Sequence, residues 1–474
     1  MHALRAPDCG LPLIDTGLLE RYDRQGPRYT SYPAAPQFTS AFGVADLRAH
    51  AARSNLRPGP RELSLYVHVP FCFSPCFYCG CNRVISRDTA KAERYVEHLL
   101  HEIALIAPLF DREREVVQLH LGGGTPNFLS AETLQWLIDG LGEAFTLSRA
   151  RSRDYSIELD PRSVPPDYAP ALARLGFNRV SLGVQDFDPE VQRAVNRMQS
   201  TEETLDLIDA CRDSGFRSVN VDLIYGLPRQ TPAAFRRTLR MVMSARPDRL
   251  AVYGYAHLPG LFKAQRRIDA ATLPSAAERL ELLQLAIEEL CAGGYRYIGM
   301  DHFALPDDEL VQAQEVGALQ RNFMGYTTHA GCDLIGLGVS AISHIGESYS
   351  QNFRELKKWE SALATGRLPL WRGLTPSADD RIRAEVIGQL MCQGAIDMRA
   401  IEARYRIDFA AYFEQALTRL RSHLADGLIV IADGRITAIA SGRLLLRSIA
   451  MCFDAYLTVP AAADVPRPSY SRVL

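Results

Sequence analysis

Six short apolar runs alternate with longer stretches in which apolar residues recur at helical spacing. The runs cover residues 63–69, 116–121, 155–159, 179–184, 218–224 and 250–255. One helical stretch contains Leu205 and Ile208, and another contains Leu283, Ile287 and Leu290 on one face. Strands that alternate with helices form a parallel sheet covered by those helices. The pattern predicts an α/β fold, an open, partial TIM-like (β/α)6 barrel over residues 62–375 with an extension at its end.

The pattern changes on both sides of this barrel. Residues 1–61 are Pro-rich and weakly periodic, so we expect an irregular segment that crosses the barrel or wraps its surface. From residue 376 to 474, an amphipathic stripe is followed by apolar runs at 428–431 and 436–439. The Asp433-Gly434 pair between these runs indicates a hairpin. Helices followed by a hairpin predict a smaller, mostly helical, winged-helix-like domain, which we interpret as a cap on the barrel mouth.

Composition and charge narrow the class of protein. The chain has 474 residues and a formal net charge of -2, and it contains no basic block, which argues against nucleic acid or a membrane surface as its main partner. No apolar run approaches the roughly 20 residues needed to span a bilayer. The first residues do not lead into a secretory apolar region. We therefore expect a cytoplasmic enzyme that acts as a monomer.

The first apolar run is followed by a cluster of cysteines. Cys72, Cys76 and Cys79 have the spacing C-x-x-x-C-x-x-C, and Cys81 follows closely. Three thiolates on a short loop can hold three irons of a 4Fe-4S cluster, which leaves the fourth iron open to the amine and carboxylate of S-adenosylmethionine. In this respect the chain resembles the radical S-adenosylmethionine superfamily.

Two other interpretations of the cysteine cluster are less favoured. A structural zinc site normally takes a second cysteine pair or a Cys-His pair, and none follows at a suitable distance. A disulfide is less favoured still, because clustered cysteines in a cytoplasmic enzyme more often bind a metal or take part in catalysis.

Polar and glycine residues gather where the predicted strands end, which is the side of a parallel barrel that carries chemistry. Gly122-Gly123-Gly124-Thr125-Pro126 follows the second run, while Glu158, Gln185 and Asp222 lie at the ends of later runs. The glycines are explained either as a tight turn or as a place where backbone amides approach a ligand. Glu158 and Asp222 have two possible roles: they contact a ligand, or they cap a helix or form an ion pair.

Longer motifs resemble one family, the oxygen-independent coproporphyrinogen III oxidases. These motifs are Tyr66-Val67-His68-Val69-Pro70-Phe71-Cys72, His120-Leu121-Gly122-Gly123-Gly124-Thr125-Pro126, Gly183-Val184-Gln185-Asp186-Phe187, Asp222-Leu223-Ile224-Tyr225-Gly226-Leu227-Pro228 and Gly325-Tyr326-Thr327-Thr328. The resemblance extends from Pro27-Arg28-Tyr29-Thr30-Ser31-Tyr32-Pro33 to Cys452-Phe453-Asp454, nearly the whole chain.

The resemblance implies cluster ligation by Cys72, Cys76 and Cys79, and two molecules of S-adenosylmethionine. The residues implied for the first molecule are Tyr66, Gly123, Glu158 and Ile342. Those implied for the second are Tyr78, Gly124, Thr125, Gln185, Arg197, Asp222 and Ala256. The implied catalytic residues are Glu158, Phe323, Met324 and Ile342. Cys81 belongs to the family pattern but receives no ligand role.

The implied reaction converts two propionate side chains of coproporphyrinogen III to vinyl groups without oxygen, by way of a 5′-deoxyadenosyl radical, and gives protoporphyrinogen IX for haem biosynthesis. The implied partners are this substrate and an electron donor such as a flavodoxin or ferredoxin system. Arg28 is our candidate for gripping a propionate. The chain departs from the family pattern at Leu121, where tryptophan is common, and at Met324, where glutamine is usual.

Two related functions stay open at this point. A haem-binding chaperone shares this fold and cluster motif, but such relatives commonly have Cys-x-Phe after the third cysteine and lack the N-terminal segment. Gly80-Cys81 and Arg28-Tyr29 therefore favour the oxidase. A radical enzyme that acts on another tetrapyrrole is the second alternative, and Met324 is the residue that points to it.

Overall fold

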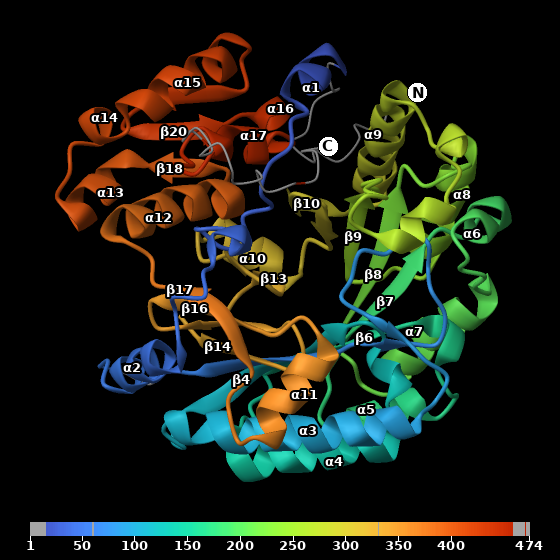
Figure 1. Ribbon diagram of the computed structural model, residues 1–474. Coiled ribbons are helices and arrows are strands. Elements are labelled where there is room, and N and C mark those ends of the chain that lie inside the picture. The colour runs from blue at the N-terminus through green and yellow to red at the C-terminus, as the bar shows by residue number, and fades with distance from the viewer. Residues whose placement is uncertain (1–15, 59–60, 330, 458–469, 471–474) are drawn as a thin grey trace.

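A mixed sheet of thirteen strands forms the centre of the protein (Figure 1). The computed structural model describes residues 16–58, 61–329, 331–457 and 470. All six predicted strands are present: β1 (Leu63–Val69), β4 (Glu115–Gly123), β6 (Asp154–Leu159), β7 (Arg179–Gln185), β8 (Ser218–Tyr225) and β9 (Arg249–Gly254). They pair in parallel in the order β9-β8-β7-β6-β4-β1. The α/β prediction is therefore confirmed.

The sheet contains further strands that the sequence did not predict: most of them extend its two edges, and one pairs with the amino end of β4. These are β5 (Thr146–Leu147), β10 (Arg296–Gly299), β11 (His302–Ala304), β14 (Asp333–Leu337), β15 (Ile342–Ile345), β16 (Ser348–Asn352) and β17 (Leu370–Leu374). β14 runs parallel to β1, whereas β15, β16 and β17 continue antiparallel. β15 and β16 were missed because polar residues interrupt them, whereas β14 was missed although all five of its residues are buried.

Helices cover the outer face of the parallel strands (Figure 1). They are α3 (Ala90–Ile106), α4 (Ala131–Ala144), α5 (Tyr168–Arg174), α7 (Thr201–Asp213), α8 (Pro232–Ser244) and α9 (Ala276–Ala292). The predicted stripes on α7 and α9 face the core, where Ile208 and Leu290 are buried. The Ser130 hydroxyl caps α4 by accepting from Thr133 N, and Ser275 forms a capping box with Glu278 on α9. This arrangement brings the carboxyl ends of the strands to one rim.

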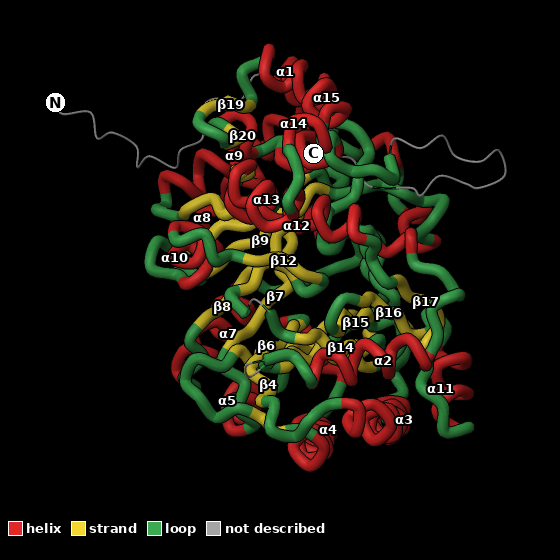
Figure 2. The backbone as a smooth tube through the Cα atoms, turned by 90° about the vertical axis from the view of Figure 1, so that its left-hand side faces the viewer, coloured by secondary structure: helices red, strands yellow, loops and turns green. Residues whose placement is uncertain are grey.

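A second core lies in the C-terminal region, shown above the barrel in Figures 1 and 2. Its elements are α12 (Ala378–Gln393), α13 (Met398–Tyr405), α14 (Phe409–Tyr412), α15 (Glu414–Ala425), α16 (Ala440–Arg443), α17 (Leu446–Met451), β18 (Ala395–Asp397), β19 (Ile429–Ala432) and β20 (Arg435–Ala438). The stripe on α12 is buried, and the predicted hairpin is β19–β20, to which β18 adds a third strand. The predicted helical C-terminal region is confirmed.

The N-terminal segment contributes to both cores, because Leu47 and Ala51 are buried in the core of the large sheet and the stretch around Tyr29 is buried in the second core. Tyr29 and Tyr32 are buried there, and the Tyr29 hydroxyl donates to the Asp454 carboxylate at 3.0 Å. The expectation of an irregular segment is wrong for two stretches, α1 (Thr16–Tyr22) and α2 (Val44–Asn55). α2 was missed because its buried face carries mainly small or polar residues, with Leu47 as the one large apolar side chain. Within the described part of the chain, no helix is long and apolar enough to cross a membrane.

Candidate active site

The three predicted ligand cysteines line one cavity at the carboxyl rim of the strands. The short strands β2 (Phe71–Cys72) and β3 (Val84–Ile85) pair at the two ends of the cysteine loop and so fix it. The cavity has a volume of about 290 Å³ and is lined by Cys72, Cys76 and Cys79, and we call it the cysteine cavity. The sequence prediction that these thiols converge agrees with this geometry.

Each of these sulfurs accepts a hydrogen bond. Thr125 Oγ1 lies 3.4 Å from Cys72 Sγ, and the backbone N of Cys81 lies 3.4 Å from Cys79 Sγ. Arg197 Nη1 lies 3.5 Å from Cys76 Sγ. Hydrogen bonds to sulfur are among the features by which proteins tune iron–sulfur clusters. Three converging thiols with donors already directed at them fit a 4Fe-4S cluster with one iron left open.

The thiols differ in acidity. Burial raises the pKa of Cys72 to about 11. For Cys79, the hydrogen bond with Cys81 outweighs burial and lowers the pKa to about 6. The same hydrogen bond and burial raise the pKa of Cys81 well above its ordinary value. Cys79 is therefore the more acidic thiol of this pair, and the ligand role of Cys79 and the lack of one for Cys81 stay predictions.

The glycine run after β4 lets the backbone approach the cysteine loop. Gly123 has a φ of +112°, and a Cβ there would lie 2.4 Å from the His68 ring. A Cβ on Gly124 would lie 2.7 Å from the backbone C and O of Pro70. The backbone N of Gly124 donates to Val69 O at 2.8 Å, which ties the run to the end of β1. Both positions require glycine for steric reasons.

Glu158, at the end of β6, is held by two donors. Gly123 N donates to Glu158 Oε2 at 3.1 Å, and His120 Nε2 lies 3.2 Å from Oε1. Burial opposes ionisation of this carboxyl, but the hydrogen bond and charge of His120 and the Gly123 N–H outweigh it and lower the pKa of Glu158. Glu158 is therefore an ionised acceptor that faces the cavity.

Asp222, on β8, has a pKa that shifts in the opposite direction to that of Glu158. Asn220 Nδ2 donates to its Oδ1 at 2.9 Å, and Ser181 Oγ donates to its Oδ2 at 3.1 Å. Burial and the negative charge of Glu158 outweigh these hydrogen bonds and raise the pKa of Asp222 to about 6. A bound cation or a sugar hydroxyl would stabilise the ionised form of such a carboxylate.

Arg197 supplies positive charge to the cysteine cavity. Its guanidinium pairs with Asp160, with Nη2 3.1 Å from Oδ1, and Asp160 also pairs with Arg162 at 2.6 Å. Within the described residues, Arg197 Nε is buried and has no hydrogen-bond partner. A buried donor without a partner is costly, so this atom indicates a site for an acceptor such as a ligand carboxylate.

A second cavity of about 430 Å³ adjoins the first, and we call it the Tyr66 cavity. It is lined by Tyr66, Phe323, Met324 and Ile342 together with Gly123, Glu158 and Cys81, which also line the cysteine cavity. Tyr66 stacks on His120 with ring centroids 5.8 Å apart. Phe323 makes an edge contact with Tyr349 at 6.0 Å. The wall is mostly apolar, although Glu158, Gln351 and Arg354 also line it.

Comparison with known proteins identifies the family. Residues 66–242 match the Radical SAM superfamily, and residues 377–445 match the HemN C-terminal domain. A Pseudomonas aeruginosa relative named oxygen-independent coproporphyrinogen III oxidase is 51% identical over 97% of this chain and 98% of its own length. The chain belongs to the oxygen-independent coproporphyrinogen III oxidase family.

A relative and a solved structure, both from Escherichia coli, support the assignment. The Escherichia coli K12 relative of the same name is 46% identical over 97% of this chain and 98% of its own length. The solved structure of coproporphyrinogen III oxidase (HemN) from Escherichia coli, described as a radical SAM enzyme, has a TM-score of 0.89 and 46% identity. The alignment of the two structures covers 94% of this chain and 100% of the Escherichia coli chain. The fold of the oxidase family thus extends over nearly the whole protein.

The residues that the family resemblance implied for two ligands divide only in part between the two cavities, because Gly123 and Glu158 line both. All four residues of the first set line the Tyr66 cavity: Tyr66, Gly123, Glu158 and Ile342. Six residues of the second set line the cysteine cavity: Tyr78, Gly124, Thr125, Gln185, Arg197 and Asp222. Among the described residues of that set, Ala256 lines neither cavity, and its backbone O accepts from Gln265 Nε2 at 3.1 Å. The roles of all these residues stay predictions.

Three further residues shape the oxidase site, and none of them was assigned a ligand or catalytic role from the sequence. His120 orients Glu158, while Asp160 and Arg162 hold Arg197 and Cys76. His120 lies inside the glycine motif, and Asp160 follows Glu158 closely along the chain, so their positions carried a signal. Arg162 carried none, because its role depends on the turn after β6.

The N-terminal segment reaches this site. Arg28 forms an ion pair with Asp301, and its guanidinium carbon lies 5.6 Å from the centroid of the Tyr253 ring. Tyr253 lines the cysteine cavity. Arg28 is therefore near the cavities, but its charge is already paired with Asp301.

Proposed function

We propose that this protein catalyses the oxygen-independent oxidative decarboxylation of two propionate side chains of coproporphyrinogen III to vinyl groups, giving protoporphyrinogen IX in haem biosynthesis. The observation that carries the proposal is the meeting of a three-cysteine cavity and a mostly apolar cavity at Gly123 and Glu158. The similarity to named oxidases over 97% of the chain supports it and favours it over a haem-binding chaperone.

The cofactors in this proposal are a 4Fe-4S cluster and S-adenosylmethionine. Cys72, Cys76 and Cys79 would hold the cluster, with hydrogen bonds to all three sulfurs. When bound, these groups supply the radical that removes a hydrogen atom from the propionate β-carbon. The chain itself orients the ligands, keeps water from the reacting carbon and balances charge.

We further propose that two molecules of S-adenosylmethionine bind, one in each cavity. Glu158 is ionised and accepts a hydrogen bond from Gly123 N in the shared wall, so it suits an ammonium or a ribose hydroxyl of the first molecule. Asp222 and the unpartnered Nε of Arg197 suit the amine or ribose and the carboxylate of the second. Of these two cavities, Tyr66 and Ile342 line only the Tyr66 cavity, and six residues of the second set line only the cysteine cavity, which supports this assignment.

The substrate would lie against Phe323 and Met324, beside the first S-adenosylmethionine, which takes the part of the Tyr66 cavity lined by Tyr66, Gly123, Glu158 and Ile342. Their apolar surfaces suit the pyrrole rings, and they exclude water from the β-carbon. Coproporphyrinogen III carries four propionates, so cations must meet it at the rim. Arg28 can do so where a propionate replaces Asp301 as its partner. We expect the electron donor to be a flavodoxin or ferredoxin system.

An anaerobic assay tests the proposal. Purified protein with a reconstituted cluster is incubated with coproporphyrinogen III, S-adenosylmethionine and a chemical reductant, and the porphyrin products are separated by chromatography. We expect protoporphyrinogen IX with the wild-type protein and none with Cys79→Ser, because an alkoxide is a poor substitute for a thiolate on iron. Cleavage of S-adenosylmethionine without this product would overturn the proposed substrate.

Cys81→Ser is the matched control for the ligand assignment. It changes a neighbouring cysteine in the same way, and we expect it to retain the cluster, measured as iron content and Mössbauer spectrum. A variant series in which Cys81→Ser loses the cluster and Cys79→Ser keeps it would show that the assignment of the third ligand is wrong.

A further inference from the structure

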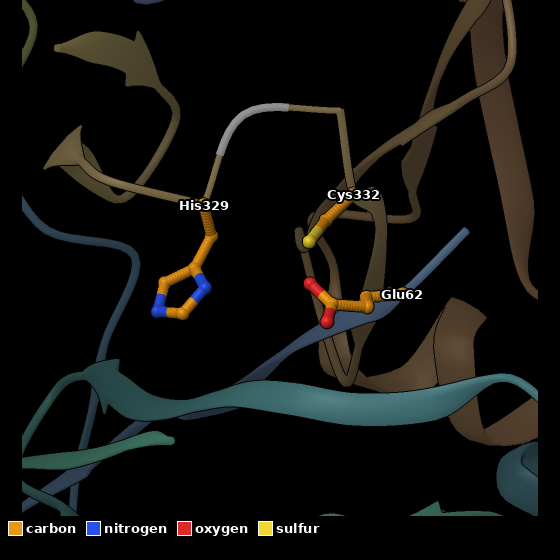
Figure 3. Close-up of side chains that lie close together, drawn as sticks. All are labelled: Glu62, His329 and Cys332. Atoms are coloured by element: carbon orange, nitrogen blue, oxygen red, sulfur yellow. The ribbon is translucent and has the colours of Figure 1, made fainter. Parts of the chain in front are cut away.

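Three different metal-binding side chains converge at the amino ends of the strands, away from the cysteine loop (Figure 3). Glu62 directly precedes β1, and Cys332 directly precedes β14. His329 lies in the connection between β13 (Gly325–Thr327) and β14. One carboxylate oxygen, one ring nitrogen and one sulfur of these residues all lie within 4.8 Å of one another. None of these residues takes part in the proposed function.

The sheet fixes two of the three positions. β1 and β14 are parallel neighbours with Leu63 opposite Asp333, so Glu62 and Cys332 occupy the preceding pair. Asp333 N donates to Glu62 O at 3.3 Å at this point. The convergence of Glu62 and Cys332 is therefore a consequence of strand register and does not depend on a loose loop.

The ring of His329 is oriented by a carboxylate on its far side. His329 Nε2 lies 3.0 Å from Asp154 Oδ2, and the two side chains are only 14% and 9% exposed. Arg217 Nη2 holds Asp154 in turn, at 2.5 Å from Oδ1. Figure 3 shows the other ring nitrogen on the side of Cys332 and Glu62.

This orientation has a chemical consequence. When Nε2–H donates to Asp154, Nδ1 carries the lone pair and faces the other two donors. A carboxylate that holds the outer nitrogen of a metal-binding histidine is the usual support for such a ligand. The side chain is thus arranged as a ligand before any ion binds.

We propose that Glu62, His329 and Cys332 form a binding site for Zn²⁺, with water as the fourth ligand. A sulfur, an imidazole nitrogen and a carboxylate oxygen suit zinc, whereas Mg²⁺ and Ca²⁺ prefer oxygen ligands throughout. Bonds of about 2.0–2.3 Å to zinc require the donors to move closer by roughly 1 Å. Glu62 is exposed and can make this movement.

The charges at the site are compatible with a divalent cation. The thiolate of Cys332 and the carboxylate of Glu62 together offset the charge of Zn²⁺, and the thiol proton leaves to solvent when the metal binds. The nearby Arg114 is paired with Asp333 at 2.7 Å, and Arg61 lies 3.7 Å from the same carboxylate. The two guanidinium groups share this one carboxylate, so about one positive charge remains nearby, which the two anionic ligands have to outweigh.

Zinc binding to the cluster-loaded protein tests the proposal. The holoprotein and its variants are dialysed anaerobically against Zn²⁺ with a competing chelator, and zinc and iron per chain are measured by mass spectrometry. We expect zinc affinity to fall at least about tenfold in His329→Gln and in Cys332→Ala, with iron content unchanged. Equal zinc affinity in the wild type and both variants would overturn the site.

His98→Gln is the matched control, because His98 and His101 on α3 form a surface histidine pair with ring centroids 6.3 Å apart. It should leave the tight zinc affinity unchanged, and a loss there would place the ion on α3 and overturn the proposal.

X-ray absorption of the zinc-loaded protein distinguishes the site from the cysteine loop. We expect one sulfur neighbour at about 2.3 Å with nitrogen and oxygen neighbours. His329→Cys should retain zinc and show two sulfur neighbours. Because a misfolded variant would not bind zinc in this way, the result also controls for loss of the fold. Zinc with three or four sulfur neighbours in the wild type would place the ion at the cysteine loop and contradict the proposal.

Discussion

Two carboxylates in the cysteine cavity, Glu158 and Asp222, have pKa values that shift in opposite directions. Glu158 receives donors from His120 and Gly123, which lower its pKa despite burial. Asp222 is buried and faces the charge of Glu158, so its pKa is raised to about 6. When two neighbouring carboxyl groups receive unequal hydrogen bonding, the pKa of one falls and the pKa of the other rises. The site keeps Asp222 charged at neutral pH at a cost to stability.

Asp222→Asn should therefore stabilise the folded protein and lower its activity. Because the folded-state pKa lies above the ordinary value of 3.8, the folded protein binds the extra proton and stability falls as pH rises through about 6. Removing the charge should raise the free energy of unfolding by at most about 3 kcal/mol above pH 6. We expect a higher melting temperature at pH 7.5 with lower turnover, and little difference in melting at pH 4.

Asp206→Asn, on an exposed position of α7, is the control for this change and should alter neither quantity. If Asp222→Asn lowered the melting temperature at pH 7.5, the ionised carboxylate would be a stabilising partner and the assigned cause of the pKa shift would be wrong.

Met324 tests how much one donor matters to the substrate. It lines the Tyr66 cavity where the family usually has glutamine. A neutral hydrogen bond contributes about 0.5–1.5 kcal/mol, so its loss changes a rate by roughly tenfold at most. We expect retained coproporphyrinogen III oxidase activity and a modest increase in Met324→Gln, measured as product formed per minute. Product formed only by Met324→Gln would indicate a different natural substrate.

At this scale the sequence predicted the cysteines, glycines and carboxylates, because their spacing and position at strand ends are local properties. It did not predict Asp160 or Arg162 as site residues, since their role follows from ion pairs with Arg197 and Cys76 across the cavity. The assignment of Ala256 to the second ligand set stays a prediction, because its carbonyl accepts from Gln265 and still has a second lone pair for a ligand.

At the scale of elements, the turn after β4 determines how close the ligands come to the cysteine loop. Gly124→Ala should disturb it, because the new Cβ would meet Pro70 backbone atoms at 2.7 Å and backbone cannot move aside easily. We expect a loss of about 1–3 kcal/mol in stability and at least about tenfold weaker binding of S-adenosylmethionine, measured by equilibrium dialysis.

Gly142→Ala is the control on the following helix α4, where the new Cβ would lie 3.8 Å from Leu147 Cδ1. Alanine in a helix should stabilise it by about 0.5–1 kcal/mol and leave binding unchanged. If Gly124→Ala bound the ligand as the wild type does, the close approach of this turn would have no functional role.

Helices and strands with a clear pattern of apolar residues were predicted from the sequence, and those without such a pattern were not. The six parallel strands have continuous apolar runs, whereas β15 and β16 contain serine, histidine and asparagine and depend on their neighbours for pairing. The helix α2 buries Leu47, His50, Ala51 and Ser54, a face with too few large apolar residues to be recognised from its sequence.

At the scale of the whole molecule, the N-terminal segment joins the two cores. Tyr29 and Tyr32 pack among the buried residues of the C-terminal core, while the adjacent Arg28 reaches Asp301 and the Tyr253 ring beside the cysteine cavity. Ala455 N also donates to the Tyr32 hydroxyl at 3.0 Å. Anchoring of this segment should therefore affect both stability and access to the site.

Tyr29→Phe isolates that anchor. The variant keeps the ring but removes the hydroxyl that donates to Asp454, a carboxyl whose pKa is raised by burial. A buried acceptor that loses its donor costs about 1–3 kcal/mol, so we expect a lower melting temperature and faster proteolytic cleavage near residue 29. Tyr412→Phe removes a hydroxyl that also donates to an aspartate, Asp379, but in an exposed pair, and should change stability by about 0.5 kcal/mol or less. Equal effects of the two variants would show that the Tyr29–Asp454 contact does not anchor the segment.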